Sequence, residues 1–233
     1  MICSENLYRS EALRKGYRVG VTSTGPVRRR GRQAEAARND RLLLDAAREV
    51  FTTQGFDAPV SAVAERAGVG IGSLYRRYGT KEELLQRLCL LAMEQGIDAA
   101  HTALRTEEPW AGLEQYIRQC VAFRSGAFAP VAGSIDATPE MWQASKRGRA
   151  LVDALVTRAH SAGVLRTDVT TLDILLLIEQ FSRGGPTPPT DEDDNTRQRL
   201  LAIAFDGLHA RNSGALPGRP PSRQRYEARW QKS

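Results

Sequence analysis

Residues 60–85 carry the helix, turn and capping signals that most constrain the fold of this chain. They read V-S-A-V-A-E-R-A-G-V-G-I-G-S-L-Y-R-R-Y-G-T-K-E-E-L-L. Val63, Ala64 and Ala67 recur at the three-to-four residue spacing that builds one apolar face of a helix. Gly68 predicts the end of that helix, because glycine readily adopts the left-handed conformation that follows many helices.

Two further helices are predicted after this glycine turn. Leu74 and Tyr78 lie four residues apart, so they share the buried side of a short helix. Thr80 and Glu83 have the spacing of a capping box, which starts another helix at Lys81. Two helices joined by a glycine-containing turn predict a helix-turn-helix, whose second helix enters the major groove of DNA.

The same residues resemble the DNA-binding module of the TetR family, the tetracycline-repressor-like bacterial regulators. The usual pattern there is I-A-x-x-A-G-V-S-x-G-T-L-Y-x-H-F-x-x-K-x-x-L, and this chain reads V-A-E-R-A-G-V-G-I-G-S-L-Y-R-R-Y-G-T-K-E-E-L. Gly70 replaces the common serine, and Arg77 replaces a frequent histidine with a permanent cation. The resemblance covers about residues 39–88 and implies a ligand-responsive repressor that binds an inverted-repeat operator in double-stranded DNA as a homodimer.

The residues of the short recognition helix that do not face inward are left on or near its groove side, and the resemblance places base contacts there. Arg76 has the fork needed to bind guanine, and Ile71 is able to touch a thymine methyl. Lys81 stands at a helix N-terminus, where free amides and the helix dipole favour a phosphate. The candidate DNA-binding residues are Ser61, Ile71, Gly72, Ser73, Tyr75, Arg76, Arg77 and Lys81.

A helix-turn-helix shape also occurs in proteins that never touch DNA, so a helical small-molecule-binding protein or adaptor is the alternative interpretation. The position of the charge favours DNA. The net charge is +6, and residues 1–38 hold nine basic against three acidic residues, which accounts for all of it. Residues 1–36 lack sustained periodicity and are predicted to be disordered. The basic cluster at residues 28–32 is either a DNA-tracking arm or a solvated tail.

The rest of the chain shows helical patterns and no strand-like alternation, so the predicted fold is all-α with about nine helices. The first helix is expected over residues 39–54, capped by Asn39 or Asp40 and ended by Gly55. Later helices are expected over residues 81–102, 110–125, 139–162, 171–183 and 191–211. The predicted divisions are a disordered basic arm over 1–36, a helix-turn-helix domain over 37–88, an effector-binding and dimerisation domain over 89–213, and a disordered tail over 214–233.

Aromatic and soft apolar side chains gather in the central helices, where they either fill the core or line a pocket. The resemblance implies that this region binds a small organic effector. The candidate ligand-binding residues are Trp110, Tyr116, Phe123, Phe128, Met141 and Trp142. Polar groups are available nearby at Gln119, Arg124 and Gln143.

The last two predicted helices of the body are apolar on two faces, and a helix of this kind needs two packing partners. The resemblance implies that two such helices from each subunit form a four-helix dimer interface. Ordinary packing inside one subunit is the alternative for each residue. The candidate contacts are Leu175, Leu176, Leu201, Phe205 and Leu208.

Patterns typical of enzymes and metal sites are missing from the sequence. His101, His160 and His209 are far apart without metal-ligand spacing, and residues 68–72, G-V-G-I-G, follow no strand. We therefore expect no catalysis, no cofactor and no metal. No signal peptide opens the chain, and its longest apolar run, residues 174–178, is too short to span a membrane. The sequence thus predicts a cytoplasmic protein without a membrane partner.

Overall fold

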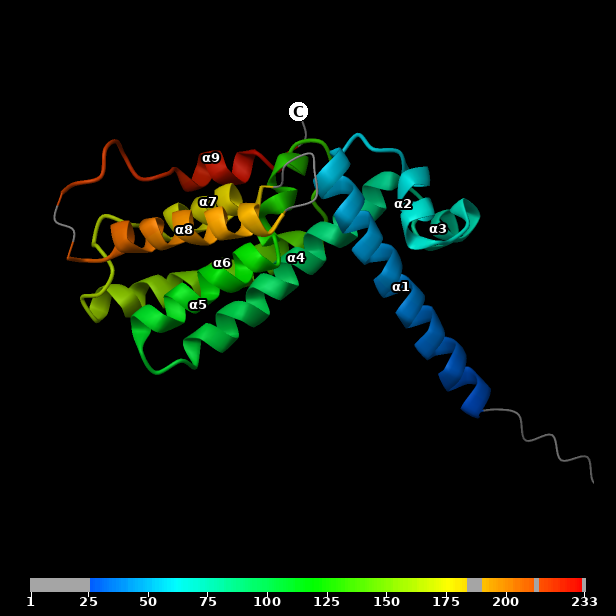
Figure 1. The fold of residues 1–233 in the computed structure, drawn as a ribbon, viewed down its shortest axis with the longest axis horizontal. Helices are drawn as coiled ribbons and strands as arrows, with labels where there is room; N and C mark the ends of the chain where they lie inside the picture. Colours follow the sequence, from blue (N-terminus) through cyan, green and yellow to red (C-terminus); the bar gives the residue numbers. More distant parts are fainter. Residues whose placement is uncertain (1–25, 184–189, 212–213, 232–233) are drawn as a thin grey trace, which may run out of the picture. The chain divides into compact units, whose positions relative to one another are not determined.

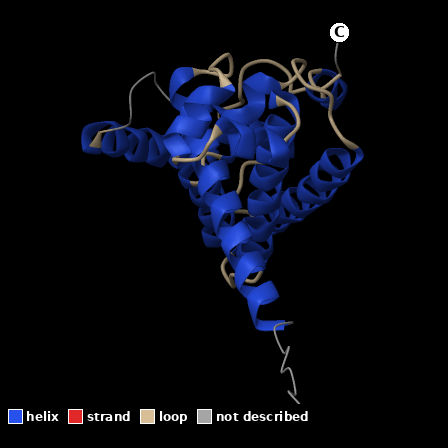
Figure 2. Ribbon diagram, turned by 90° about the vertical axis from the view of Figure 1, so that its right-hand side faces the viewer, coloured by secondary structure: helices blue, strands red, loops and turns tan. Residues whose placement is uncertain are grey.

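The structure is a computed structural model, and it describes residues 26–183, 190–211 and 214–231. Residues 1–39 form one unit and residues 40–233 another. The described residues form nine α-helices and one 3-10 helix, and among them there is no β-strand (Figure 2). The predicted all-α fold is therefore confirmed.

The first helix, α1, spans Pro26–Gln54 and thus begins thirteen residues before the predicted start. The prediction was wrong because the lack of sustained periodicity and the glycine and proline residues of this stretch, Gly31 among them, were weighted too strongly against a helix. One glycine costs a helix only about 1 kcal/mol, and alanine, glutamine, glutamate and arginine around it favour helix. Residues 26–36 of the predicted disordered arm, including the basic cluster, are helical, whereas residues 1–25 lie outside the described part.

Three short connections join α1 to α2 (Val60–Ala67), α3 (Ile71–Arg77) and α4 (Lys81–Leu104). The predicted inward stripe of α1, Leu43, Ala47, Val50 and Phe51, is buried. It packs in one hydrophobic cluster with residues of α2 and α3 and with the first turns of α4. The three helices of the predicted head therefore share one hydrophobic core with the first turns of α4, because each helix presents an apolar face.

The body is built around α4, which packs against α5 (Pro109–Ala122) and α6 (Pro139–Ser161). A 3-10 helix, η1 (Ser125–Val131), contacts both α4 and α7 (Thr171–Ser182), and α8 (Asp191–Leu208) lies alongside in Figure 1. Threonine side chains cap four of these helices by accepting a hydrogen bond from a backbone N–H three residues later. They are Thr80, Thr138, Thr170 and Thr190.

The C-terminal residues fold back instead of forming the predicted disordered tail. Helix α9 spans Arg223–Ala228 and is capped by the Ser222 hydroxyl, which accepts from Arg225 N. Tyr226 and Trp230, one helical turn apart, are partly buried. The low apolar content of the tail misled the prediction, since the neighbouring charged residues Glu227 and Arg229 form ion pairs with the body.

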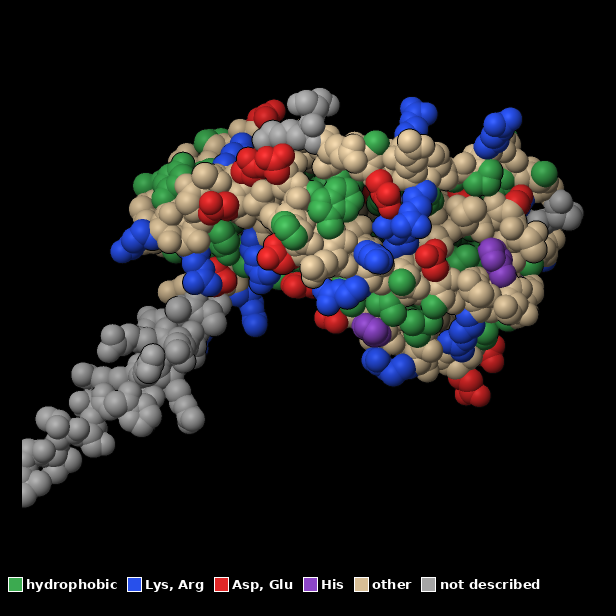
Figure 3. All heavy atoms as spheres, turned by 180° about the vertical axis from the view of Figure 1, so that it is seen from behind, with side chains coloured by type: hydrophobic (Ala, Val, Ile, Leu, Met, Phe, Trp, Pro, Cys, Tyr) green, Lys and Arg blue, Asp and Glu red, His purple; other side chains and the backbone are tan. Residues whose placement is uncertain are grey.

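Acidic and basic side chains are mixed over the face of the molecule shown in Figure 3, with hydrophobic patches between them. This mixture agrees with the charge balance of the sequence beyond residue 38. No helix within the described ranges is both long and apolar enough to cross a membrane.

Candidate functional site

The turn between α2 and α3 has the geometry that its glycines predict. Gly68 has φ 67° and ψ 29°, which is the left-handed conformation, and its N–H donates to carbonyls of α2. Val69 N donates to Ala64 O at 3.0 Å and closes the turn. Gly70 then precedes α3 without a side-chain hydrogen bond, as expected from the loss of the usual serine.

Helix α3 presents one buried and one open side. Leu74 is fully buried and Tyr78 is 8 % exposed, so both anchor the helix to the core as predicted. Ile71 and Tyr75 are 41 % and 48 % exposed, which is unusual for large apolar side chains. The other exposed residues of the helix are Gly72, Ser73, Arg76 and Arg77. This open side thus gathers six of the eight candidate DNA-binding residues on seven consecutive positions.

Arg76 and Arg77 differ in what they contact. Arg76 Nη2 donates to Ser73 Oγ at 2.9 Å, an exposed bond that a base edge can replace. Arg77 Nε instead donates to Asp40 Oδ1 at 2.8 Å, and the Tyr78 hydroxyl donates to the same oxygen at 2.8 Å. Arg77 therefore ties the end of α3 to α1, and Asp40 lies within α1 instead of capping it as expected.

The ionisation of this Asp40 cluster follows from its contacts. Burial acts to raise the pKa of Asp40, but hydrogen bonds from Arg77 and Tyr78 and the guanidinium charge lower it overall. Burial and the Asp40 carboxylate raise the pKa of Tyr78 to about 12. The charged Asp40 and the neutral Tyr78 are therefore the favoured forms in the folded head.

We expect Asp40→Asn to lower the free energy of unfolding by about 1–2 kcal/mol at pH 7, a modest loss because Arg77 is half-exposed. The folded pKa of Asp40 lies below its ordinary value of 3.8, so ionised Asp40 contributes stability above pH 3.8. That contribution disappears as the pH falls through the folded pKa. Urea unfolding at pH 7, 5 and 3 should show the difference between wild type and variant shrinking at the lowest pH; a constant difference would contradict this role.

The two remaining candidates flank the recognition helix. Ser61 is exposed in the first turn of α2. Lys81, the first residue of α4, is half-buried, and its Nζ lies 5.6 Å from the centroid of the Phe51 ring. This cation–π contact holds the ammonium group beside the start of α4.

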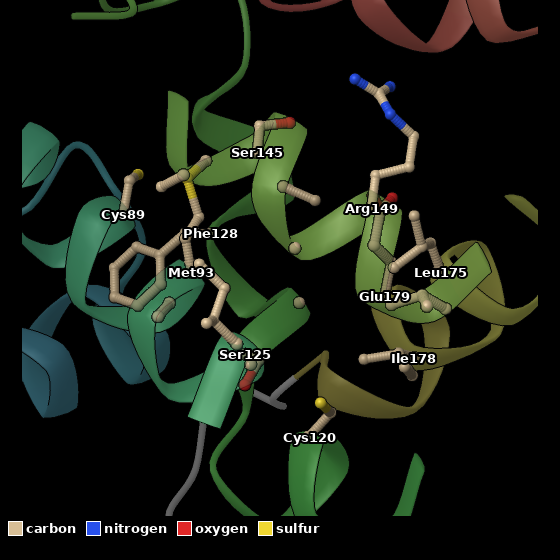
Figure 4. A pocket seen from close by; sticks show the side chains of 18 of the residues that line it. Cys89, Met93, Cys120, Ser125, Phe128, Ser145, Arg149, Leu175, Ile178 and Glu179 are labelled. Atoms are coloured by element: carbon tan, nitrogen blue, oxygen red, sulfur yellow. The ribbon is translucent and has the colours of Figure 1, made fainter. Parts of the chain in front are cut away.

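A cavity of about 150 Å³ lies between α4, α5, α6, α7 and η1, and α9 borders it (Figure 4). Its apolar wall includes Met93 and Ile97 of α4, Phe128 of η1 and Ile178 of α7. Gly126 brings η1 close to α7, because a Cβ there would lie 2.6 Å from Glu179 Cα. The cavity thus depends on a close backbone approach that only glycine permits.

Two of the six candidate ligand-binding residues line this cavity, Tyr116 and Phe128. Trp110 lies elsewhere, with its ring 6.3 Å from Phe205 and 4.4 Å from His209. Met141 is buried in the core shared with the head, and both Phe123 and Trp142 are exposed. The polar candidates Gln119, Arg124 and Gln143 are likewise absent from the described lining. Four of the six candidates thus lie outside this cavity, because helix orientation, which decides the lining, is a tertiary property; that they bind an effector stays a prediction.

Several cavity residues were missed in the sequence. Arg149 and Glu179 are the charged members of its described lining, and the aromatic residues Tyr226 and Trp230 come from the C-terminal segment. Ser125 Oγ is buried without an oxygen or nitrogen partner among the described residues, beside the Cys120 thiol. The four-residue spacing of Tyr226 and Trp230 was the signal that could have indicated a packed helical face.

Comparison with known proteins identifies the protein family that has this exposed helix α3 and this helical body. Residues 43–88 match the family profile described as bacterial regulatory proteins, tetR family. Residues 108–210 match the profile of the Transcriptional regulator SbtR-like, C-terminal domain. The chain belongs to the TetR family. It is a transcriptional regulator with the DNA-binding head and helical body of that family.

Solved TetR structures share this fold. A TetR regulator from Mycobacterium vanbaalenii is 28 % identical, with a TM-score of 0.53 over 76 % of this chain and 98 % of its own. The TetR regulator SCO0520 from Streptomyces coelicolor is 25 % identical, with a TM-score of 0.52 over 73 % and 98 %. The ketosteroid regulator KstR2 of Mycobacterium tuberculosis, at 21 % identity, a TM-score of 0.51 and 74 % and 95 % coverage, shows the fold alone. No curated protein matches the chain.

The residues predicted to form the TetR dimer interface are mostly buried within the single chain. Leu201 and Phe205 are 1 % and 5 % exposed and belong to the core of the body. Leu175 and Leu208 are partly buried against the same core, and Leu176 is half-buried. On the opposite side of α8, Leu200 and Ile203 are 51 % and 60 % exposed. The residues predicted on α8 therefore lie mainly on its inward face, and their role in a dimer stays a prediction.

Within the described part of the TetR chain, no group of three or more His, Cys, Asp or Glu side chains is placed to hold a metal ion. Cys89 and Cys120 are free and buried in the cavity wall. Burial raises the pKa of the Cys89 thiol to about 12, and burial likewise raises that of Cys120 to about 12. Both thiols are therefore held in their protonated, unreactive form.

Proposed function

We propose that the chain is a ligand-responsive repressor that binds an inverted-repeat operator as a homodimer. The observation that carries the DNA part is the open side of α3, where Ile71, Tyr75 and Arg76 are exposed together. An isoleucine, a tyrosine and a forked cation on a short exposed helix suit the methyl groups, sugars and guanine edges of a major groove. Membership of this family supports a regulatory role. We propose that the chain acts in the cytoplasm, where DNA is reached, and catalyses no reaction.

A single helix of this length covers few base pairs, so two-fold symmetry is needed to extend the readout. The exposed Leu200 and Ile203 of α8 supply an apolar surface for a two-fold dimer contact. We propose that α8, with the half-buried Leu176 of α7, packs against the same helices of a second copy.

We expect Arg76→Ala to weaken operator binding by about 1–3 kcal/mol and to relax preference at one base pair of each half-site. Among the described residues, the guanidinium of Arg76 is held by the exposed bond to Ser73, so its loss should leave the fold intact. Fluorescence anisotropy on DNA flanking the chain's own gene measures affinity, and a library randomised at single positions measures preference.

Arg76→Lys is the matched control, because lysine keeps the charge but loses the forked geometry. It should lose base preference while retaining non-specific binding and its dependence on salt. If affinity and base preference are unchanged in Arg76→Ala, Arg76 does not read the operator.

We infer that the cavity holds the effector and that α4 transmits its binding. Cys89, Met93 and Ile97 line the cavity along α4, and the same helix begins at Lys81 next to the recognition helix. A ligand that shifts α4 would therefore displace α3 from the groove. Linkage requires that the effector weakens DNA binding by the same factor as DNA weakens effector binding.

A thermal-shift screen of small organic molecules, followed by DNA titration with each hit, tests this coupling. We expect saturating effector to reduce operator affinity by about 5–150-fold. Gly126→Val should remove the response, since its side chain would meet the α7 backbone at the cavity. A ligand that binds the cavity yet leaves operator affinity unchanged would show that the cavity is not the switch.

A further inference from the structure

The C-terminal segment, residues 222–230, contributes part of the cavity wall. Tyr226 and Trp230 line the cavity from α9 and from the residues just after it. Trp230 also packs against the hydrophobic cluster that the head shares with the body. In Figure 1 the helix α9 lies over the body beside α7 and α8. The segment therefore covers one side of the cavity.

Two ion pairs hold this segment in place. The segment supplies the basic residue of one pair and the acidic residue of the other. Arg229 of the segment binds Glu179 of α7 with two hydrogen bonds, at 2.9 and 3.1 Å. Glu227 of the segment binds Arg149 of α6 at 2.7 Å. The Tyr226 hydroxyl adds a bond of 2.9 Å to Glu179. Each charge of the body thus meets the opposite charge on the segment.

Burial explains why these contacts matter. Glu179 is 6 % exposed and Arg149 has a side chain only 12 % exposed. A buried charge without a partner is strongly unfavourable, so each of these side chains needs the segment or an equivalent partner. The segment thereby neutralises both charged residues of the described cavity lining.

We propose that the C-terminal segment is a lid, which seals a small uncharged and largely apolar ligand into the cavity and opens by breaking these two ion pairs. The proposal deepens the effector function proposed above and rests on it for the identity of the site, because the lid would set how fast an effector enters and leaves. With the lid closed, both wall charges are already paired, and the space left is lined mainly by apolar side chains. An engineered apolar cavity of comparable volume, about 150 Å³, binds benzene in another protein.

The cavity contains its own reporters of lid opening. Cys89 on α4 and Cys120 on α5 lie on different walls (Figure 4). The third cysteine, Cys3, is removed by Cys3→Ser, which leaves the two cavity thiols alone in the full-length chain. Both thiols are buried, so a neutral reagent such as N-ethylmaleimide should react with them faster when the segment moves away.

The test compares alkylation rates of Cys89 and Cys120 in this Cys3→Ser chain, followed by mass spectrometry. Arg229→Ala should raise both rates by about tenfold to a hundredfold, the expected effect of losing hydrogen bonds to a buried charge. Glu227→Arg should also raise them, and adding Arg149→Glu should restore slow labelling by reversing the pair. Arg66→Ala is the control, since it removes an ion pair of 2.7 Å with Glu49 away from the cavity.

Hydrogen exchange separates lid opening from unfolding. Faster exchange in Arg229→Ala should be confined to α9 and the cavity wall. Wild-type labelling rates in both Arg229→Ala and Glu227→Arg would contradict the lid proposal. Equally faster hydrogen exchange throughout α4 and α5 would also contradict it. Because no DNA is used, these outcomes are independent of the proposed repressor function, which fails only if operator binding or its response to effector is absent.

Small aromatic probes test the ligand class in the same chain. Toluene should slow alkylation of the closed cavity, whereas benzoate and benzylammonium should not, because both charged wall residues are already paired. Protection by a charged probe with none by toluene would overturn the uncharged ligand class.

Discussion

The double variant Leu200→Glu/Ile203→Glu is expected to be monomeric and to bind the operator at least about a thousandfold more weakly, which is the usual lower limit of the gap between specific and non-specific DNA binding. Both leucine and isoleucine are more than half exposed in the single chain and lie on one face of α8. Four carboxylates brought together across a two-fold axis would repel one another where apolar packing is needed. Light scattering measures the mass, and anisotropy measures the DNA affinity.

Leu216→Glu is the matched control for this variant. Leu216 is 44 % exposed, close to the exposure of Leu200, but it lies outside α8. It should leave both mass and operator affinity unchanged. A wild-type chain that is already monomeric at micromolar concentration, or a double variant that remains dimeric, would show that α8 is not the interface.

The head could be predicted from the sequence because its signals are local. The glycine at position 68, the cap at Thr80 and the spacing of Leu74 and Tyr78 each act within one or two helical turns. These signals fix where helices begin, end and bury a face, and the structure agrees with them. The early start of α1 is the exception, since the lack of apolar periodicity before residue 39 did not prevent a helix there.

The sites in the body were less predictable because they depend on how helices are rotated. Helix α8 carries apolar residues on both sides, so its sequence does not distinguish Leu200 from Leu201. Only packing in the folded body decides that Leu201 faces the core. The contacts of Arg229 with Glu179 span fifty residues, and no local pattern connects them. Charge pairs of this kind are visible only after the chain has folded.

Substitutions on the inward face of α8 are expected to cause a large loss of folding stability. Leu201→Ala should lower the free energy of unfolding by about 2–5 kcal/mol, because Leu201 is 1 % exposed and its loss leaves a cavity in the core. Leu201→Asp should cost more and leave little folded chain, since a carboxylate would replace an apolar contact beside Phe205. Urea unfolding followed by circular dichroism measures both changes.

Concentration dependence separates this core effect from loss of the dimer. A homodimer gains stability by mass action, so removing an interface side chain lowers stability through weaker association. Leu200→Ala, one residue away on the outward face, should therefore lower the urea midpoint at protein concentrations where the wild type is dimeric, and have little effect where it is monomeric. Leu201→Ala should lower the midpoint by a similar amount at every concentration, because the lost contacts lie within one chain. If the two variants shift in the same way with concentration, Leu201 contributes to the interface and the inward assignment of this residue fails.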